Sequence, residues 1–272
     1  DSKKLNDLRH SSAHLLASAV LNLWPDTKLT IGPATSEGFY YDLDFKTPIN
    51  ESDLPKIEKE MTRILPSWKE FKGREINKEE AMKLFKDNPY KKELIDEIVQ
   101  KGEKITLFKA GDFEDLCRGG HVKNPSGEIK AFKLLSIAGA YWRGSEKNKM
   151  LTRIYGTAFP TEKELNEYLN LLEEAKKRDH RKIGEKLEIF TIREEVGPGL
   201  ILWLPNGTII KDLIEEFAKK TEKEWGYKRV STPNITKSGL YYTSGHLPYY
   251  QKDMYPPMRG DKGEEYYLKP MN

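Results

Sequence analysis

Two short clusters of residues could do chemistry. The first is His10 and His14, separated by SSA; on a helix this i, i+4 spacing puts both imidazoles on one face, so two nitrogens can approach one ion or one water. The second is Cys117 and His121, separated by RGG, whose paired glycines indicate a loop that lets backbone approach a ligand closely. Together they offer three nitrogens and one sulfur, which would suit tetrahedral zinc. They would equally suit a metal-free site that positions a hydrolytic water, and the residues alone leave both open.

Both clusters also have a structural explanation as ordinary core or surface residues. Positions 11 and 12 are serines, so the glutamate of the HExxH zinc-protease motif is missing and a metalloprotease is not indicated. The sequence contains no P-loop, no GxGxxG fingerprint and no GxSxG elbow. If the protein handles ATP, it does so without a Walker motif.

Four further residues lie near these clusters in the sequence or in the expected elements. Asp115 stands two residues before Cys117, and Lys91 stands at the start of an expected helix. Tyr40 and Tyr41 are neighbours on an expected strand, so one faces the core and the other is exposed.

A separate run of cations is either a solvated helix face or a contact to a phosphate backbone. It consists of Lys176, Lys177, Arg178, Arg181 and Lys182.

Helices and strands that alternate irregularly must position these side chains, which favours an α+β fold over a parallel α/β sheet. A helix from about residue 4 to residue 24 carries the histidine pair and stops at Pro25. Further helices are expected over 52–65, capped by Ser52, over 77–86, and from Asn88 to Gly102. TKLTIGP, GFYYDLDF, KITLF, EIKAFKLLSIAGAYW and KMLTRIYGTAF predict strands, and DFEDLCRGGH predicts a polar loop.

The second half of the sequence predicts a connector and another domain. Thr161 followed by Glu164 predicts the capped start of a long helix that continues through KKRDHRKIGEK. This helix would join a domain at 1–158 to a second one at 186–272. The second domain is expected to contain a helix over 209–225, a strand at YKRVSTP and a strand at EEYYLKPMN. The last strand has few expected backbone partners, so we expect this domain to be truncated.

Composition excludes several classes of protein. The chain has 272 residues, 33% charged, with 46 cations against 43 anions, and no stretch approaches the roughly 20 apolar residues of a membrane span. The start, DSKKLNDLRH, has no apolar signal region and no initiator Met, so we expect it to lie inside a longer protein. A single cysteine excludes a disulfide framework and favours a reducing, cytoplasmic location.

Six stretches together resemble the threonyl-tRNA synthetase family, in family order and over nearly the whole chain. They are HSSAHLLASAVLNLWPDTKLTIGP, GFYYDLDF, DLCRGGH, AGAYWRGSEKNKMLTRIYGTAF, LEEAKKRDHRKIG and EYYLKPMN. The fourth stretch also resembles the second additional domain that alanyl-tRNA synthetases and free-standing editing proteins share. The segment around Arg178 and Arg181 and the C-terminal motifs favour the threonyl member.

The resemblance implies a layout and two activities. Residues 1–158 would form an editing domain with a mixed or antiparallel sheet, 159–185 a linker helix, and 186–272 the start of the class II aminoacylation domain, from motif 1 to the lead-in to motif 2. The full-length family attaches threonine to tRNA(Thr) with ATP, Mg²⁺ and Zn²⁺, and acts as a homodimer. Editing hydrolyses mischarged Ser-tRNA(Thr), because a missing methyl costs only about 1–3 kcal/mol of discrimination in synthesis. Editing is the activity expected in this chain, and aminoacylation is not.

The resemblance also implies roles for individual residues. His10 and His14 would orient the attacking water and the terminal ribose, and Cys117 and His121 would close the other side of the pocket. Lys91 would hold the water or stabilise the developing charge.

Asp115 and Tyr41 would contact the seryl amine or hydroxyl. The cations between Lys176 and Lys182 would contact tRNA. The family usually reads CRGPH, so Gly120 in place of proline would make the loop more flexible. No metal is expected to be required for editing, although zinc could occupy the His/Cys cluster as it does in alanyl relatives.

Two competing hypotheses stay open. One is a free-standing, alanyl-type editing protein that depends on zinc, although such proteins do not need residues 186–272. The other is a non-catalytic fragment that binds tRNA or dimerises, in which apolar residues such as Trp203, Leu204 and Trp225 would be exposed. No hypothesis places the protein in a membrane.

Overall fold

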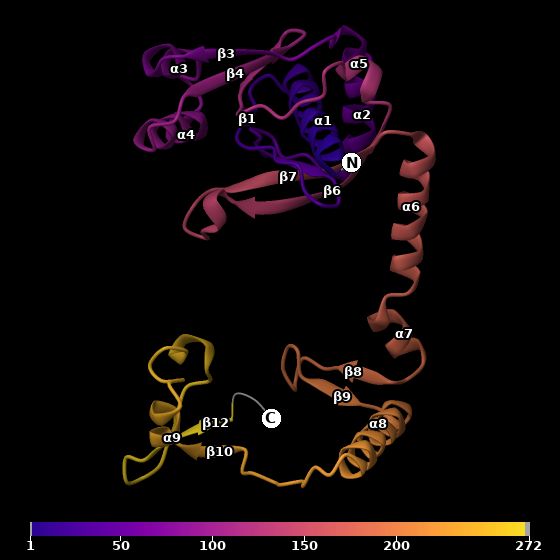
Figure 1. Cartoon of the computed structure of the whole chain (residues 1–272), viewed down its shortest axis with the longest axis vertical. Coiled ribbons are helices and arrows are strands. Elements are labelled where there is room, and N and C mark those ends of the chain that lie inside the picture. The colour runs from indigo at the N-terminus through magenta and orange to yellow at the C-terminus, as the bar shows by residue number, and fades with distance from the viewer. Residues whose placement is uncertain (1, 270–272) are drawn as a thin grey trace. The chain divides into compact units, whose positions relative to one another are not determined.

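The computed structural model describes residues 2–269, which fall into two units that divide between Arg178 and Asp179. Both units combine helices with sheets, and every strand pair described is antiparallel (Figure 1). The α+β class expected from the sequence is therefore confirmed.

The main core of the first unit lies between a four-stranded sheet and two helices. The sheet has the order β1-β2-β7-β6, with β1 at Lys28–Leu29, β2 at Phe39–Asp44, β6 at Ala131–Tyr141 and β7 at Met150–Phe159. Helix α1 (Ser2–Leu23) packs on this sheet, and α2 (Leu54–Ile64) packs on α1.

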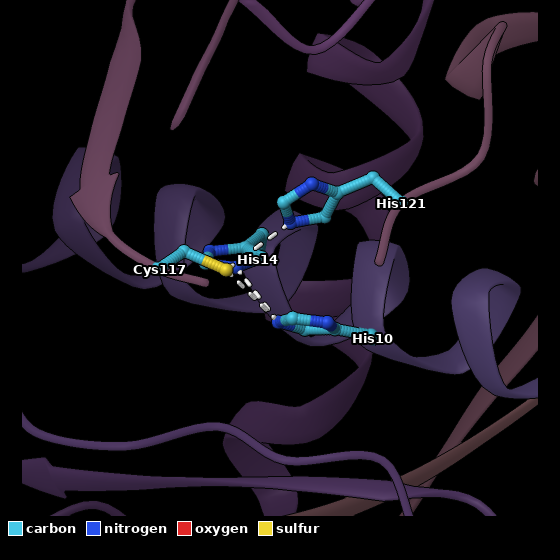
Figure 2. Close-up of side chains that lie close together, drawn as sticks. All are labelled: His10, His14, Cys117 and His121. Atoms are coloured by element: carbon cyan, nitrogen blue, oxygen red, sulfur yellow. Dashed lines mark hydrogen bonds between the residues drawn. The ribbon is translucent and has the colours of Figure 1, made fainter. Parts of the chain in front are cut away.

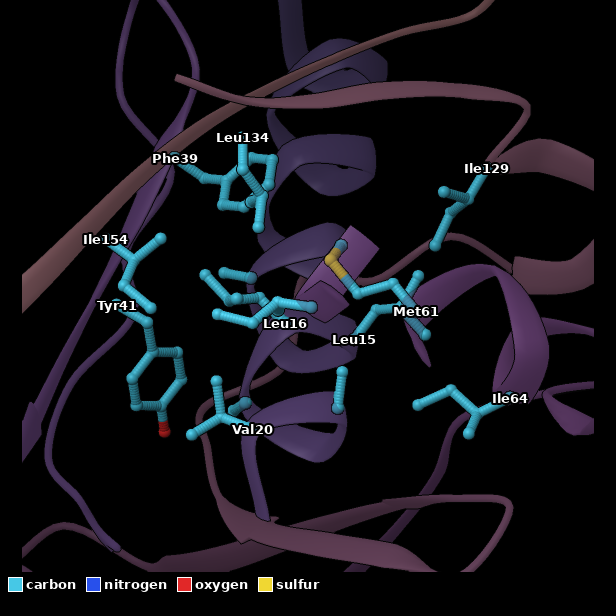
Figure 3. Packing of buried hydrophobic residues seen from close by; sticks show 14 of the residues in the cluster. Leu15, Leu16, Val20, Phe39, Tyr41, Met61, Ile64, Ile129, Leu134 and Ile154 are labelled. Carbon is cyan, nitrogen blue, oxygen red and sulfur yellow. The ribbon is translucent and has the colours of Figure 1, made fainter. Parts of the chain in front are cut away.

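Helix α1 is buried on more than one side because it is enclosed in this way. Figure 3 shows Leu16 toward the strand residues Phe39 and Ile154, and Leu15 toward Met61 of α2. All five side chains are at most 1% exposed, and burying each one stabilises the fold by roughly 1.5–3 kcal/mol. The helix that carries the histidine pair is therefore rigidly placed.

A second, three-stranded sheet in the first unit has the order β3-β4-β5. Its strands are β3 (Lys72–Ile76), β4 (Ile105–Ala110) and β5 (Phe113–Leu116). Helices α3 (Lys78–Leu84) and α4 (Pro89–Gln100) pack on it through a small cluster centred on Ala81, Ile95 and Ile105. Asn77 and Asn88 cap these two helices through their side chains, as the sequence predicts.

Several expectations for the first unit are corrected. The expected loop at 112–121 contains β5, which pairs with β4 through residues 113–116, and strand β3 was not expected. Ser52 does not cap the helix at 52–65; Asn50 caps a short 3₁₀ turn at Glu51–Asp53 that leads into α2, because its side chain accepts from the Ser52 amide at 2.9 Å. The short helix α5 (Pro125–Glu128) was also not expected.

The expected continuous linker helix is wrong. Helix α6 (Glu162–Lys177) begins after the Thr161 cap as predicted, but it ends at Lys177, and a separate helix α7 (His180–Lys186) follows. The Asp179 carboxylate accepts from the Arg181 amide at 2.9 Å and so caps a new helix. An Asp in this position competes with continued helix, and the two units divide here.

The second unit contains two small sheets. β8 (Phe190–Ile192) pairs with β9 (Ile201–Trp203), and helix α8 (Pro205–Glu224) follows. β12 (Glu265–Leu268) lies between β10 (Ile235–Lys237) and β11 (Met258–Arg259), next to α9 (Ser238–Thr243). The expected strand at YKRVSTP is not present. The C-terminal strand β12, which was expected to have few backbone partners, is paired along both edges, with β10 and with β11. Residues 270–272 of the EYYLKPMN stretch lie outside the described residues.

Helix α8 leaves large apolar side chains uncovered within its own unit. Leu213, Ile214 and Phe217 are 60%, 63% and 71% exposed. Between residues 2 and 269 no helix is both long and apolar enough to cross a membrane.

Candidate functional site

The two histidine-containing clusters meet in the first unit. His10 and His14, one turn apart on α1, have their Nε2 atoms 3.1 Å apart. The Cys117 Sγ, in the segment just after β5, lies 3.4 Å from the Nε2 of His10 and 3.4 Å from the Nε2 of His121. Figure 2 shows the three imidazoles and the thiol pointing toward a common centre. One donor atom from each residue lies within 4.8 Å of every other.

The loop that carries Cys117 and His121 is shaped by its glycines and by aromatic neighbours. Gly120 has φ +84°, a left-handed conformation that glycine adopts readily. His121 stacks on Phe71 with ring centroids 4.0 Å apart, and Phe108 lies 4.7 Å away. These two phenylalanines, which the sequence did not single out, fix the plane of the imidazole.

Burial keeps this cluster electrically neutral at neutral pH. It lowers the pKa of His10, and it lowers the pKa of His14 well below the ordinary value, with the other imidazoles and Lys91 as further causes. Burial and the proximity of His10 lower the pKa of His121 to about 3. Burial raises the pKa of the Cys117 thiol to about 11. The imidazoles are therefore unprotonated at neutral pH and keep a free lone pair, whereas the thiol is protonated and a poor nucleophile.

A buried ion pair lies next to the cluster. The Lys91 Nζ is 2.6 Å from Asp115 Oδ1, and the Tyr41 hydroxyl donates to Asp115 Oδ2 at 2.6 Å. The three side chains are at most 2% exposed. His14 Nδ1 is 4.0 Å from the same carboxylate, which is too long for a hydrogen bond. The Tyr41 ring fits only because position 32 is glycine, since a Cβ there would overlap the ring.

One open cavity of about 450 Å³ is lined by three residues of the cluster and by the three residues of the ion-pair network, but not by His121. They are His10, His14, Cys117, Tyr41, Lys91 and Asp115. Helix α4 provides a second wall through Leu94, Glu97 and Ile98, and the segment 30–33 provides another. A cavity of this size with a few converging polar groups is typical of a small-molecule or ligand-end site.

Comparisons with known proteins bear on this site. Residues 105–155 match the family model described as the threonyl and alanyl tRNA synthetase second additional domain. The chain is 53% identical over 275 aligned residues to a threonine–tRNA ligase of Dehalococcoides mccartyi, and the match covers 100% of the chain and 47% of the relative. Ligases of Borreliella burgdorferi and Rubrobacter xylanophilus are each 52% identical over 97% of the chain, which covers 45% and 41% of them.

The chain is a relative of the threonyl-tRNA synthetases. The predicted resemblance to this family is thereby confirmed, and the chain spans about half the length of the relatives it matches.

The donor set fits a zinc-sized ion only in part. Tetrahedral zinc holds nitrogen and sulfur ligands about 3.3–3.6 Å apart. Three separations in the cluster, of 3.1, 3.4 and 3.4 Å, are close to this range, and all donor atoms lie within 4.8 Å of one another. Metal-binding histidines usually donate their second N–H to a fixed partner. The Nδ1 atoms of His14 and His121 are buried and have no hydrogen-bond partner within residues 2–269. The four donor atoms are present, but His14 and His121 have no partner within the described residues that would fix their second ring nitrogen.

The cationic residues expected to bind tRNA are exposed. Lys176 and Lys177 end α6, and Arg178 follows it. Arg181 and Lys182 belong to α7. Several are partly neutralised, because Lys177 lies 2.8 Å from Glu174 and Arg181 lies 2.6 Å from Asp179.

Proposed function

We propose that the first unit hydrolyses the ester of mischarged Ser-tRNA(Thr), the editing reaction of the threonyl-tRNA synthetase family. The observation that carries the proposal is the convergence of His10, His14, Cys117 and His121, with Lys91, beside one cavity. Neutral imidazoles beside a buried ammonium are the groups that ester hydrolysis by water requires.

Water is the nucleophile in this mechanism. A water held by His10 and His14 attacks the seryl carbonyl carbon, and one imidazole takes the proton. The carbonyl oxygen gains the negative charge, which the Lys91 ammonium stabilises. The ester C–O bond then breaks, and the ribose oxygen receives the proton from the imidazolium. The products are serine and tRNA with a free terminal hydroxyl.

Tyr41 and Asp115 have a supporting role in this mechanism. Asp115 accepts from Lys91, from the Tyr41 hydroxyl and from the Leu116 amide. This network holds the ammonium in place. Contact with the seryl amine or hydroxyl would share these same carboxylate oxygens, and it remains a prediction.

The remaining parts of the proposal follow the relatives' names and the resemblance. We assign residues 1–158 to the editing domain, 159–185 to a linker and 186–272 to the first part of a class II aminoacylation domain. In the longer protein this domain would join threonine to tRNA(Thr) with ATP, Mg²⁺ and Zn²⁺, as a homodimer in the cytoplasm. The cations from Lys176 to Lys182 would contact the tRNA.

Zinc-assisted hydrolysis is the second candidate, favoured by the mutual distances of the four donors. A bound zinc would lower the pKa of a water and so supply hydroxide at neutral pH. His10, His14, Cys117 and His121 would hold it. The unpartnered Nδ1 atoms of His14 and His121 favour the metal-free form instead.

The deciding experiment measures deacylation of Ser-tRNA(Thr) and Thr-tRNA(Thr) by this chain, with and without a chelator. We expect serine to be released, threonine to be retained and the chelator to have no effect. His10→Ala and His14→Ala should each lower the rate by about 10²–10⁴-fold, the usual contribution of general acid–base catalysis. Lys163→Gln, at an exposed lysine outside both the site and the proposed tRNA contacts, is the matched control that should keep the rate.

Two outcomes would replace the proposal. Loss of activity with the chelator, restored by Zn²⁺, would favour the zinc-dependent alternative. No hydrolysis of either ester by a folded sample would reduce the chain to a tRNA-binding or dimerisation fragment.

A further inference from the structure

Helix α4 connects the two sheets of the first unit and carries Lys91 into the site. Its N-terminus is fixed by Asn88, whose side chain caps the helix and donates to the Leu29 carbonyl of β1 at 2.7 Å. Its inner face packs on the three-stranded sheet through Ile95. The position of Lys91 therefore also depends on the contacts that α4 makes with the four-stranded sheet, which contains β6 and β7.

That hold comes from the tip of the β6–β7 hairpin. Trp142 is 6% exposed, and its indole Nε1 donates to the Glu93 carboxylate at 2.9 Å. Arg143 donates to Glu93 at 3.1 Å and is paired with Glu97 one turn further along α4. The guanidinium also lies over the Trp142 ring, 4.8 Å from its centre.

The tip is built to keep this contact. Arg143 has φ +59°, a conformation that costs a non-glycine residue energy. The Trp142 ring packs edge-on against Tyr90, whose hydroxyl donates to Asp44 at 2.9 Å. Asn148 donates to the Trp142 carbonyl at 2.9 Å and closes the loop.

We propose that Trp142 and Arg143 are positioning residues for Lys91, acting through their contacts with Glu93 and Glu97 on α4. Glu93 lies two residues after Lys91, so a shift of the helix moves the ammonium and the cavity wall together. The inference rests on the proposed hydrolysis of Ser-tRNA(Thr), in which Lys91 stabilises the carbonyl oxygen.

The test compares Trp142→Phe, Arg143→Met and Arg143→Lys in steady-state deacylation of Ser-tRNA(Thr). Phe keeps the ring and loses the N–H, and Lys keeps the charge. We expect kcat to fall about tenfold for Trp142→Phe and Arg143→Met with KM nearly unchanged, because small displacements of a catalytic group are costly. Arg143→Lys should recover part of the loss. Lys147→Ala is the matched control, since this exposed lysine is on the same tip and has no ion pair with any residue from 2 to 269.

Backbone hydrogen exchange separates this inference from the proposed function. Arg143→Met should speed exchange of the α4 amides while leaving those of α1 unchanged, whether or not the chain hydrolyses the ester. The positioning role of Trp142 and Arg143 would be overturned by unchanged exchange of the α4 amides, by an effect on KM alone, or by an Arg143→Lys protein as slow as Arg143→Met. If the wild-type chain is inactive but Arg143→Met still speeds exchange in α4, the proposed hydrolysis and the catalytic role of Lys91 are overturned. The finding that Trp142 and Arg143 hold α4 in place would then stand alone.

Discussion

At the scale of single residues, the candidate site is a set of polar groups held neutral by burial. Its imidazoles and its thiol share a small volume with one another and with the buried Lys91–Asp115 pair. Charges in such a volume would repel or would need their own partners. Because the thiol stays protonated and the imidazoles stay unprotonated, neither forms a charge here. This agrees with a reaction in which water, and not Cys117, attacks the substrate.

Acid should destabilise the first unit through His121. Its pKa is about 3 in the folded chain, against about 6.5 in an unfolded one. Between these values the unfolded state binds more protons, so stability is full above about pH 6.5 and is lost as the pH falls toward 3. We expect the thermal unfolding temperature to fall less between pH 7 and pH 5 in His121→Gln than in the wild type. Equal losses in both proteins would contradict the depressed pKa.

The residue types of the site could be predicted from the sequence, whereas their support could not. Spacing on a helix identifies His10 and His14 as a pair, and glycines identify the loop near Cys117. Nothing in the local sequence of Phe71 or Phe108 indicates that they enclose His121, because that contact joins separate strands and loops. Trp142 belongs to a stretch that resembles the family, but only the fold reveals that its indole bonds to Glu93.

At the scale of elements, the loop around Gly120 departs from the family's usual proline. A proline has φ near −65°, and residue 120 has φ +84°. The loop of this chain is therefore suited to glycine and not to the family residue.

Substitutions at Gly120 should reveal this dependence. We expect Gly120→Pro to lower both the unfolding temperature and the deacylation rate, and Gly120→Ala to cost about 1–2 kcal/mol from left-handed strain alone. Gly102→Ala is the control, because Gly102 has φ +69° with open space around it and lies outside the cluster. A fully active Gly120→Pro protein would mean that this loop adopts another backbone conformation.

Elements with strong local signals were predicted well, and those determined by distant partners were not. Helix α4 begins at an Asn-Pro pair, and α6 begins at Thr161, as their caps indicate. β5 was mistaken for a loop because its polar residues only become a strand through pairing with β4. The sequence does not predict the helix break at Asp179, because this residue lies within a run of charged residues that is typical of a continuous helix.

At the scale of the whole molecule, the second unit has an apolar helix face uncovered by its own residues. Leu213 and Phe217 on α8 are among the exposed side chains. The relatives are about twice as long as this chain. In the proposed synthetase, further sequence or a second copy of the chain would cover this face.

Binding of tRNA should depend on the cations at the end of α6. Lys176→Gln and Lys177→Gln together should weaken binding of tRNA(Thr), because fewer phosphates are neutralised. The slope of log affinity against log salt should become shallower by about 0.7–0.9 for each phosphate that no longer pairs with a lysine. Lys163→Gln, in the first turn of the same helix, is the control for loss of a lysine elsewhere on α6, with one charge removed where the double variant removes two. Affinity and slope that stay at wild-type values in the double variant would remove these lysines from the interface.

Every residue of the candidate site lies before the boundary at Arg178, together with the helix, sheet and hairpin tip that hold it. A gene segment that encodes residues 1–178 would thus carry every residue of the proposed hydrolytic site as one inheritable module. Recombination at Asp179 would move that module intact to a different protein, whereas a crossover between residues 14 and 91 would separate Lys91 from His10 and His14.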